Sequence, residues 1–202
     1  MKELQFETKN VDDALDYAAK ELRLNKEYLD LEVIDKKGMI IKTYTVKVSV
    51  KVDPAELGFQ TLKTMFENMD VDANIEMSLN GDTEIEYRIE TDENPILIGK
   101  GGKTLENIQF YIRNLINSFF DERVIVQLDI GGYKQNRKRQ LEILATKTAK
   151  SVARSKIAAS LEPMNAYERR IVHTKLAEWR DVSTVSEGEG SKRHLVIKPK
   201  RK

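Results

Sequence analysis

The stretch "ILIGKGGKTL", from Ile96 to Leu105, is apolar at both ends and carries three glycines and two lysines at its centre. Two kinds of loop have this composition. One is the triphosphate loop of nucleotide hydrolases, and the other is a loop that grips a nucleic-acid backbone. These interpretations predict different proteins, and the residues around the loop distinguish them.

The triphosphate loop has the spacing G-x-x-x-x-G-K-[S/T]. Gly102, Lys103 and Thr104 match its last three positions, but its first glycine falls on Leu97. That glycine lets the backbone wrap a phosphate, so the mismatch argues against nucleotide hydrolysis. "VIVQLD" resembles the second motif of these enzymes, but the chain lacks the repeated β-α-β units of a parallel sheet.

The shorter spacing G-x-x-G is matched by Gly99, Lys100, Gly101 and Gly102. Glycines let a backbone approach phosphates closely, and the first N–H groups of a following helix favour an anion. Lys100 and Lys103 add positive charge. This pattern is typical of the KH domain, whose loop clamps about four nucleotides against an apolar groove. Groove candidates are Ile98, Leu105 and Ile108, which are equally compatible with core positions.

The segments around this loop predict helix, two strands, short element, loop, helix and strand. "PAELGFQTLKTMFENMD" predicts the first helix, and "NIEMSLNGDTEIEYRIE" predicts a hairpin that turns at Asn80-Gly81. "NPILI" is a short helix or strand, "KTLENIQFYIRNLINSFF" a helix and "RVIVQLDI" a strand. Two strands before the loop and one after it resemble the bacterial, or type II, KH arrangement.

The regions on either side of this unit predict two further small modules. "LQFETKN", "NVDDALDYAAKELRL", "YLDLEVID" and "MIIKTYTVKVSVKV" predict a β-α-β-β unit, with Asn10 as the helix N-cap and "KKG" as a turn. After Gly131-Gly132 come a long basic helix, a second helix with Asn165 as N-cap, and two strands around an acidic turn. The sequence therefore predicts an α+β fold of three modules, over residues 1–52, 53–130 and 131–202.

The formal net charge of +1 hides a gradient along the chain. Residues 1–98 hold 12 Lys and Arg against 22 Asp and Glu, whereas residues 131–202 hold 18 against 7. The sign changes at the glycine loop. A basic C-terminal third favours a polyanion as partner, although separate solvated surfaces would also produce this gradient. The acidic N-terminal part would be repelled by nucleic acid, which indicates another role for it.

The segment "YERRIVHTKL" places Arg169 and His173 four residues apart, on one face of the second C-terminal helix. Such a pair can meet a phosphate and a base. Taken alone the pair is common on solvated helix faces. Here it precedes a two-strand element that carries Lys192 and Arg193. The pattern resembles the R-three-H domain, which binds single-stranded nucleic acid and is named for its Arg-x-x-x-His motif.

Composition limits the remaining classes of protein. The chain has no cysteine, so disulfides, thiolate metal sites and cysteine nucleophiles are excluded. No apolar run approaches the roughly 20 residues of a membrane span, and the first residues lack a signal-peptide core, so we expect a cytoplasmic protein. His173 and His194 lie outside any metal-ligand spacing, and no acid–base pair stands out. We therefore predict neither enzyme activity nor a metal or cofactor.

The three modules in this order resemble one family, the Jag proteins, also called SpoIIIJ-associated or KhpB/EloR proteins. The resemblance covers nearly the whole chain and is strongest at "ILIGKGGKTLENIQ", "GGYKQNRKR", "PMNAYERRIVH" and "SEGEG". "VDDALDYAAKELRL" and "KKGM" resemble the Jag-domain helix and its Lys-Gly turn. Three features depart from the family. Ala166 stands where a proline often follows the asparagine of "PMN". Met39 stands where an aromatic residue is usual, and only about "KVDPA" separates the first two modules.

This resemblance implies a bacterial single-stranded RNA-binding protein, an RNA chaperone or post-transcriptional regulator linked to cell elongation or division and so to cell shape. It also implies a dimer through the KH domain, with itself or with a small single-KH protein. The N-terminal domain would contact the cell-envelope machinery. Two other functions stay open: a protein-interaction scaffold of the elongation or division machinery with residual nucleic-acid binding, and binding of single-stranded DNA.

Overall fold

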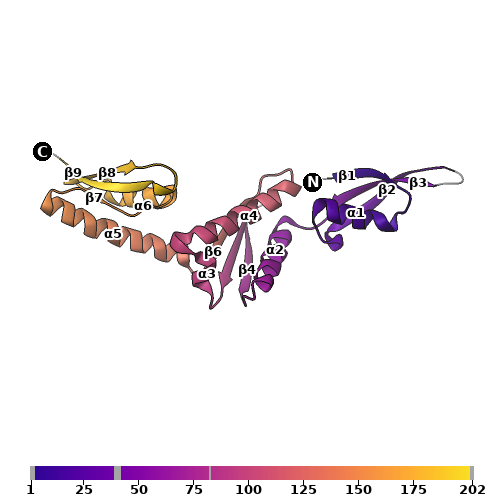
Figure 1. The fold of residues 1–202 in the computed structure, drawn as a ribbon, viewed down its shortest axis with the longest axis horizontal. Coiled ribbons are helices and arrows are strands. Elements are labelled where there is room, and N and C mark those ends of the chain that lie inside the picture. Colours follow the sequence, from indigo (N-terminus) through magenta and orange to yellow (C-terminus); the bar gives the residue numbers. More distant parts are fainter. Residues whose placement is uncertain (1–2, 39–41, 82, 201–202) are drawn as a thin grey trace. The chain divides into compact units, whose positions relative to one another are not determined.

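The computed structural model describes residues 3–38, 42–81 and 83–200 and forms two compact units, residues 1–131 (unit 1) and 132–202 (unit 2). Figure 1 shows helices and small sheets in both units, which confirms the predicted α+β class. The predicted boundary after residue 52 lies inside unit 1, so the division into three modules stays a prediction. Within the described residues, none of the helices combines the length and apolar character needed to cross a membrane.

Unit 1 begins with an antiparallel three-stranded sheet in the order β1-β3-β2. Its elements are β1 (Glu3–Thr8), α1 (Asp12–Leu22), the 3-10 turn η1 (Lys26–Tyr28), β2 (Leu29–Lys37) and β3 (Thr43–Val50). The predicted β-α-β-β order is confirmed. The helix N-cap is Val11 and not Asn10, although the Asn10 side chain still accepts a hydrogen bond from the Asp12 N–H at 3.1 Å. Met39 and the start of the predicted third strand lie outside the described residues.

The core of this first sheet continues into the following helices. Val48 and Val50 of β3 belong to one cluster of buried side chains with Leu57 and Phe119, which come from the second half of unit 1. Val52, in the short connection, lies in the same cluster. Because burying apolar surface is the main stabilising term in folding, this shared core ties the first 52 residues to the helices that follow.

The second half of unit 1 follows the predicted order of helix, two strands, short helix, loop, helix and strand. Its elements are α2 (Pro54–Asn68), β4 (Asn74–Asn80), β5 (Glu84–Glu90), α3 (Asn94–Ile98), the glycine turn η2 (Lys100–Gly102), α4 (Lys103–Phe119) and β6 (Ile125–Ile130). In the sheet β4-β5-β6 the first pair is antiparallel and the second parallel. "NPILI" forms a helix, which resolves the alternative that the sequence left open.

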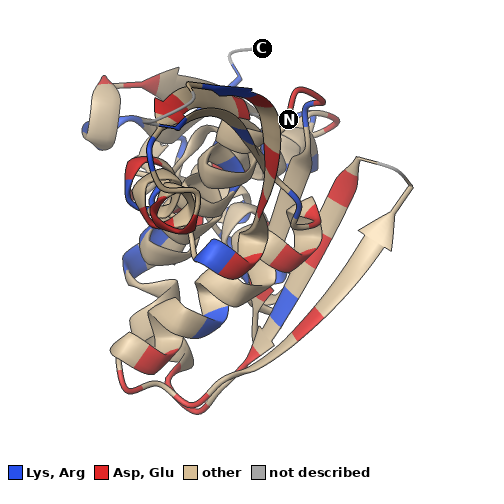
Figure 2. Cartoon of the chain, turned by 90° about the vertical axis from the view of Figure 1, so that its right-hand side faces the viewer, with Lys and Arg blue, Asp and Glu red and all other residues tan. Residues whose placement is uncertain are grey.

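The two faces of this second sheet differ in polarity. Ile85, Tyr87 and Ile89 of β5 are buried, whereas the alternating positions carry Glu84, Glu86, Arg88 and Glu90, and acidic bands mark the hairpin in Figure 2. The Tyr87 hydroxyl donates a hydrogen bond of 2.8 Å to the Ala55 carbonyl. A Cβ on Gly58 would lie 2.0 Å from that hydroxyl, so this mid-helix glycine lets α2 pack closely on the sheet.

Unit 2 packs two helices on a three-stranded sheet in the order β7-β9-β8. Its elements are α5 (Tyr133–Ser155), β7 (Ala159–Ser160), α6 (Ala166–Leu176), β8 (Val182–Glu187), the 3-10 turn η3 (Gly190–Lys192) and β9 (His194–Pro199). The two predicted helices and the strand pair are confirmed, whereas the two-residue strand β7 was missed. The chain's one tryptophan, Trp179, packs against the core of this unit.

Candidate nucleic-acid interface

The glycine loop has a backbone that only glycines adopt readily. Gly99, Gly101 and Gly102 have φ angles of +68°, +62° and +78°. The Gly99 N–H donates to the Pro95 carbonyl at 3.0 Å, and the Gly102 N–H donates to the Gly99 carbonyl at 3.2 Å. These bonds turn the chain sharply from α3 into α4. The loop therefore presents backbone groups at the start of a 17-residue helix, where anions are favoured.

The glycines serve different purposes in this loop. A Cβ on Gly99 would lie 2.1 Å from the Thr104 Oγ1 atom, so the fold itself requires glycine there. At Gly101 no heavy atom lies within 4 Å of the same position. Lys100 and Lys103 are both exposed. The space beside Gly101 is therefore open, and the lysines on either side of it in the sequence are exposed.

The predicted groove residues separate into two groups. Leu105 and Ile108 are buried in the core, so they offer a ligand little surface, while Ile98 is partly exposed. Sequence reasoning missed Ile96, which is 57% exposed on α3 beside the loop. It also missed Gln109, whose side-chain oxygen accepts a hydrogen bond from the Leu128 N–H of the edge strand β6 at 3.2 Å.

A buried ion pair fixes the start of α6. Glu168 is 5% exposed, and its Oε1 atom accepts a 2.6 Å hydrogen bond from the Arg137 Nε of α5. Its Oε2 atom accepts from the Asn165 N–H, and Asn165 accepts from the Glu168 N–H, which forms a capping box. Partial burial lowers the pKa of Arg137, but the Glu168 carboxylate outweighs that effect, so the pKa is raised. Asn165 is confirmed as the N-cap.

Arg169 and His173 are held by different partners on α6. Arg169 Nη1 donates to the Met164 carbonyl at 2.8 Å, and the Met164 N–H donates to the Arg193 carbonyl at 3.2 Å. The structure therefore brings Arg169 and the start of β9 together. His173 is exposed, and its Nδ1 atom lies 2.6 Å from the Thr184 Oγ1 of β8. Within the described part of unit 2, its Nε2 atom meets no hydrogen-bond partner.

Lys192 and Arg193 lie exposed in the turn before β9. The acidic turn expected in this region is partly paired. Glu187 at the end of β8 accepts a 2.6 Å hydrogen bond from the Lys198 ammonium, which lowers the pKa of Glu187. With this carboxylate paired, the exposed basic groups face less competition from neighbouring negative charge.

Together these features define an α+β protein with a glycine loop in unit 1 and a basic α6–β8–β9 surface in unit 2. The model of the R-three-H domain matches residues 139–199. Over 199 residues the chain is 33% identical to the RNA-binding protein KhpB of Clostridium symbiosum. This match covers 96% of this chain and 90% of the relative. It is 32% identical over 209 residues to the protein of the same name from Bacillus subtilis (strain 168), over the full length of both.

A more distant relative is the RNA-binding protein KhpB of Streptococcus pneumoniae, 24% identical over 98% of this chain and 58% of the relative. The chain belongs to the KhpB, or Jag, family, which confirms the resemblance read from its motifs. These relatives are named for RNA binding and not for a reaction, in agreement with the prediction that the chain is not an enzyme. Among the described residues, no group of three or more His, Asp and Glu is placed to hold a metal ion.

Proposed function

We propose that this protein binds single-stranded RNA through two contact sites. The clamp site comprises Gly99 to Gly102 with Lys100 and Lys103, and the helix site comprises Arg169, His173, Lys192 and Arg193. The observation that carries the proposal is that Arg169 and His173 lie one turn apart on the same face of α6. Each is oriented by a partner, Met164 or Thr184, within a region that matches the R-three-H model. Oriented cationic and imidazole groups suit a phosphate and an unstacked base.

The charge distribution supports this location of the RNA. The open face of the β4–β5–β6 sheet carries Glu76, Glu84, Glu86 and Glu90 against one arginine, Arg88, which pairs with Glu86, so its net negative charge would repel phosphates. The glycine loop lies instead at the helix side, between two exposed lysines. We therefore expect the strand to cross the loop and the edge of β6, where Ile98 and Ile96 supply apolar surface for bases.

The clamp is tested by replacing Lys100 and Gly101 with aspartate in the full chain. The open space around Gly101 and the tolerance of Asp for positive φ predict that this variant folds. Losing one charge-assisted contact and adding repulsion should weaken binding of a labelled RNA oligonucleotide about tenfold or more. Affinity is measured by fluorescence anisotropy, and folding by circular dichroism.

A matched control separates charge from backbone change. The variant Lys100→Ser with Gly101→Asn alters the same two positions without adding negative charge, so it should lose less affinity than the aspartate variant. Unchanged RNA affinity in the aspartate variant, with normal circular dichroism, would remove the clamp from the proposal.

The finer role rests on the family resemblance. We propose a cytoplasmic RNA chaperone or post-transcriptional regulator acting in cell elongation or division, as a homodimer or with a small single-KH protein. Crosslinking in cells followed by RNA sequencing tests this role. Recovery of defined transcripts supports it, whereas strong protein partners with an empty RNA profile favour a scaffold. RNA and single-stranded DNA of one sequence must be compared directly, since both motifs accept either.

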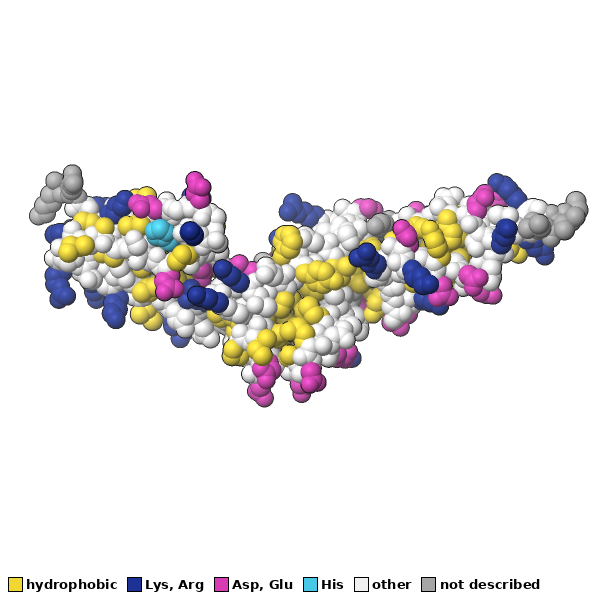
Figure 3. All heavy atoms as spheres, in the orientation of Figure 1, with side chains coloured by type: hydrophobic (Ala, Val, Ile, Leu, Met, Phe, Trp, Pro, Cys, Tyr) yellow, Lys and Arg dark blue, Asp and Glu magenta, His cyan; other side chains and the backbone are white. Residues whose placement is uncertain are grey.

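One observation favours the scaffold as second candidate. Hydrophobic side chains gather over the α2 and β4 part of unit 1 on the face drawn in Figure 3. Met69 of the α2 end and Met77 and Leu79 of the edge strand β4 are among the exposed hydrophobic residues. Exposed apolar residues beside a free strand edge are typical of protein-interaction surfaces.

A further inference from the structure

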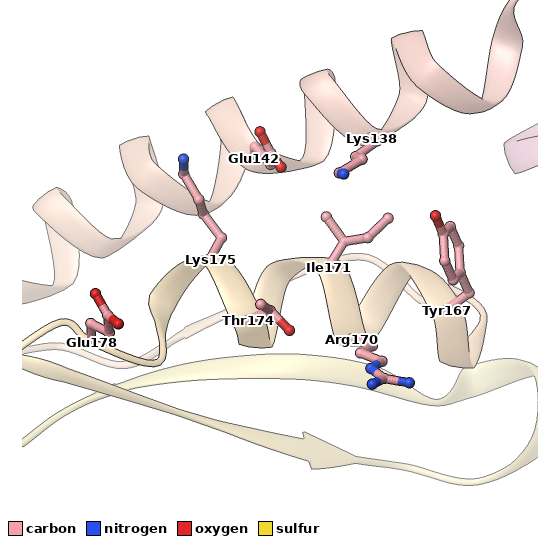
Figure 4. A pocket seen from close by; sticks show the side chains of 8 residues that line it. All are labelled: Lys138, Glu142, Tyr167, Arg170, Ile171, Thr174, Lys175 and Glu178. Carbon is pink, nitrogen blue, oxygen red and sulfur yellow. The ribbon is translucent and has the colours of Figure 1, made fainter.

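A hollow of about 500 Å³ lies between α5 and α6, apart from the clamp site and the helix site. Figure 4 shows Tyr167 at one end of it, Ile171 pointing from α6 toward α5, and the Lys138 ammonium pointing from α5 into the space. Glu142 and Lys175 lie further along the same hollow. Its volume falls within the roughly 300–1,000 Å³ typical of small-ligand sites.

The hollow occupies a different face of α6 from the helix site. Tyr167, Ile171 and Lys175 follow one another at intervals of four residues and so share one side of the helix. Arg169 and His173 form a second such row, two residues out of phase. Two residues correspond to about 200° around an α-helix, so one strand can use both rows only by passing around α6.

The side chains in this hollow have the properties that bind a nucleotide. Tyr167 is 63% exposed, and exposed aromatic side chains are the platforms on which unpaired bases stack. Ile171 supplies an apolar surface beside it. Lys138 and Lys175 supply positive charge for the phosphate.

Glu142 adds a negatively charged hydrogen-bond acceptor to the hollow. A carboxylate weakens phosphate binding, and it accepts hydrogen bonds without donating any. Among the described residues, its carboxylate oxygens have no hydrogen-bond partner. On the Watson–Crick edge of an unpaired base, guanine presents two adjacent donors, N1–H and the N2 amino group, which match the two oxygens of one carboxylate. Adenine and uracil lack this pair of donors.

We propose that the hollow holds one unpaired guanine nucleotide of the bound RNA, an inference that rests on the RNA-binding function proposed above. The base stacks on Tyr167 and Ile171, Glu142 accepts from N1–H and N2–H, and Lys138 and Lys175 meet the phosphate. The hollow thereby gives the protein a preference for guanine over the other bases.

The test is a titration of the isotope-labelled full chain with 5′-GMP, 5′-AMP and 5′-UMP, followed by amide NMR. GMP should shift the signals of residues around Lys138, Glu142 and Tyr167, and bind about tenfold more tightly than AMP, as expected for a bidentate base contact. Glu142→Gln should remove the preference for GMP while leaving weak binding of all three nucleotides. Glu162→Gln, an exposed change in the same unit outside the hollow, should preserve the preference.

Tyr167→Ala should lower the affinity for all three nucleotides about tenfold. Tyr167→Phe keeps the aromatic ring, so it should bind the nucleotides as the wild type does. Trp179 fluorescence verifies that unit 2 of each variant is folded. If an RNA oligonucleotide binds but GMP shifts no signal in the hollow, or binds no better than AMP, this inference is wrong and the RNA-binding proposal stands. If neither the oligonucleotide nor GMP binds, both are wrong.

Discussion

At the residue scale, Tyr87 shows how one buried polar group responds to pH. Burial, with smaller contributions from Asp53 and Glu56, raises the pKa of its hydroxyl far above the ordinary value of about 10. Because the folded pKa lies above the unfolded one, this residue contributes stability that is fully present below about pH 10 and is lost as the pH rises further. The folded protein should therefore become less stable in alkali.

The variant Tyr87→Phe tests this linkage. At pH 7 it should lower the free energy of unfolding by about 1 kcal/mol, because the hydrogen bond to Ala55 is lost. Above about pH 10 its stability should fall less steeply than that of the wild type. Urea unfolding followed by circular dichroism measures both effects. An exposed change, Tyr111→Phe on α4, should leave stability at pH 7 unaltered, and parallel pH profiles for Tyr87→Phe and wild type would contradict the assignment.

At the element scale, Glu168 joins α5 to the start of α6. The variant Glu168→Ala removes the capping box and leaves Arg137, whose side chain is 31% exposed, without its carboxylate. Removing one partner of a buried ion pair costs about 3–5 kcal/mol, and the partial exposure of Arg137 reduces this to about 2–4 kcal/mol. Trp179 fluorescence during urea unfolding reports unit 2 selectively, since it is the only tryptophan.

Glu168→Gln is the matched control for this pair. Glutamine keeps the shape and can still accept the N-cap hydrogen bond, so it should lose less stability than alanine. Equal unfolding midpoints for the wild type and Glu168→Ala would show that the pair contributes nothing to the packing of α6. In that case the orientation of Arg169 and His173 would have to depend on Met164 and Thr184 alone.

At the scale of the whole molecule, two weak contact sites on one chain should act together on one strand. A strand of about four nucleotides fills a single clamp, whereas a longer strand reaches both sites and gains from effective concentration. We therefore expect the variant that combines the Lys100 and Gly101 aspartate changes with His173→Ala and Lys192→Ala to bind a long RNA far more weakly than a variant that carries either pair of changes alone. Anisotropy titrations with strands of increasing length measure this effect.

The salt dependence provides the control for that experiment. Each phosphate contact removed should lower the slope of log affinity against log salt concentration by about 0.7 for single strands. If every variant binds long and short RNA with the same loss of affinity, the two sites do not engage one strand, and the two-site proposal is wrong.

The sequence by itself determined the elements and their order. Apolar spacings of 3.6 and 2 residues are local properties, and so are the turn-forming glycines and the N-cap Asn165; these predicted the helices and strands of both units. The short strand β7 was not predicted, because two residues are too few to show an alternating apolar pattern. The R-three-H motif was recognisable because its Arg and His lie one helical turn apart in a single segment.

Only the tertiary structure decided which side chains are available to a ligand. It buried Leu105 and exposed Ile96, although both are apolar residues flanking the loop. It placed Arg137 within hydrogen-bond distance of Glu168. It also placed Met164 so that its backbone bonds to both the Arg169 side chain and the Arg193 carbonyl. The physical reason is that burial and pairing depend on neighbours distant in the sequence, whose positions are fixed only when the helices pack on their sheets. The hollow between α5 and α6 has the same origin.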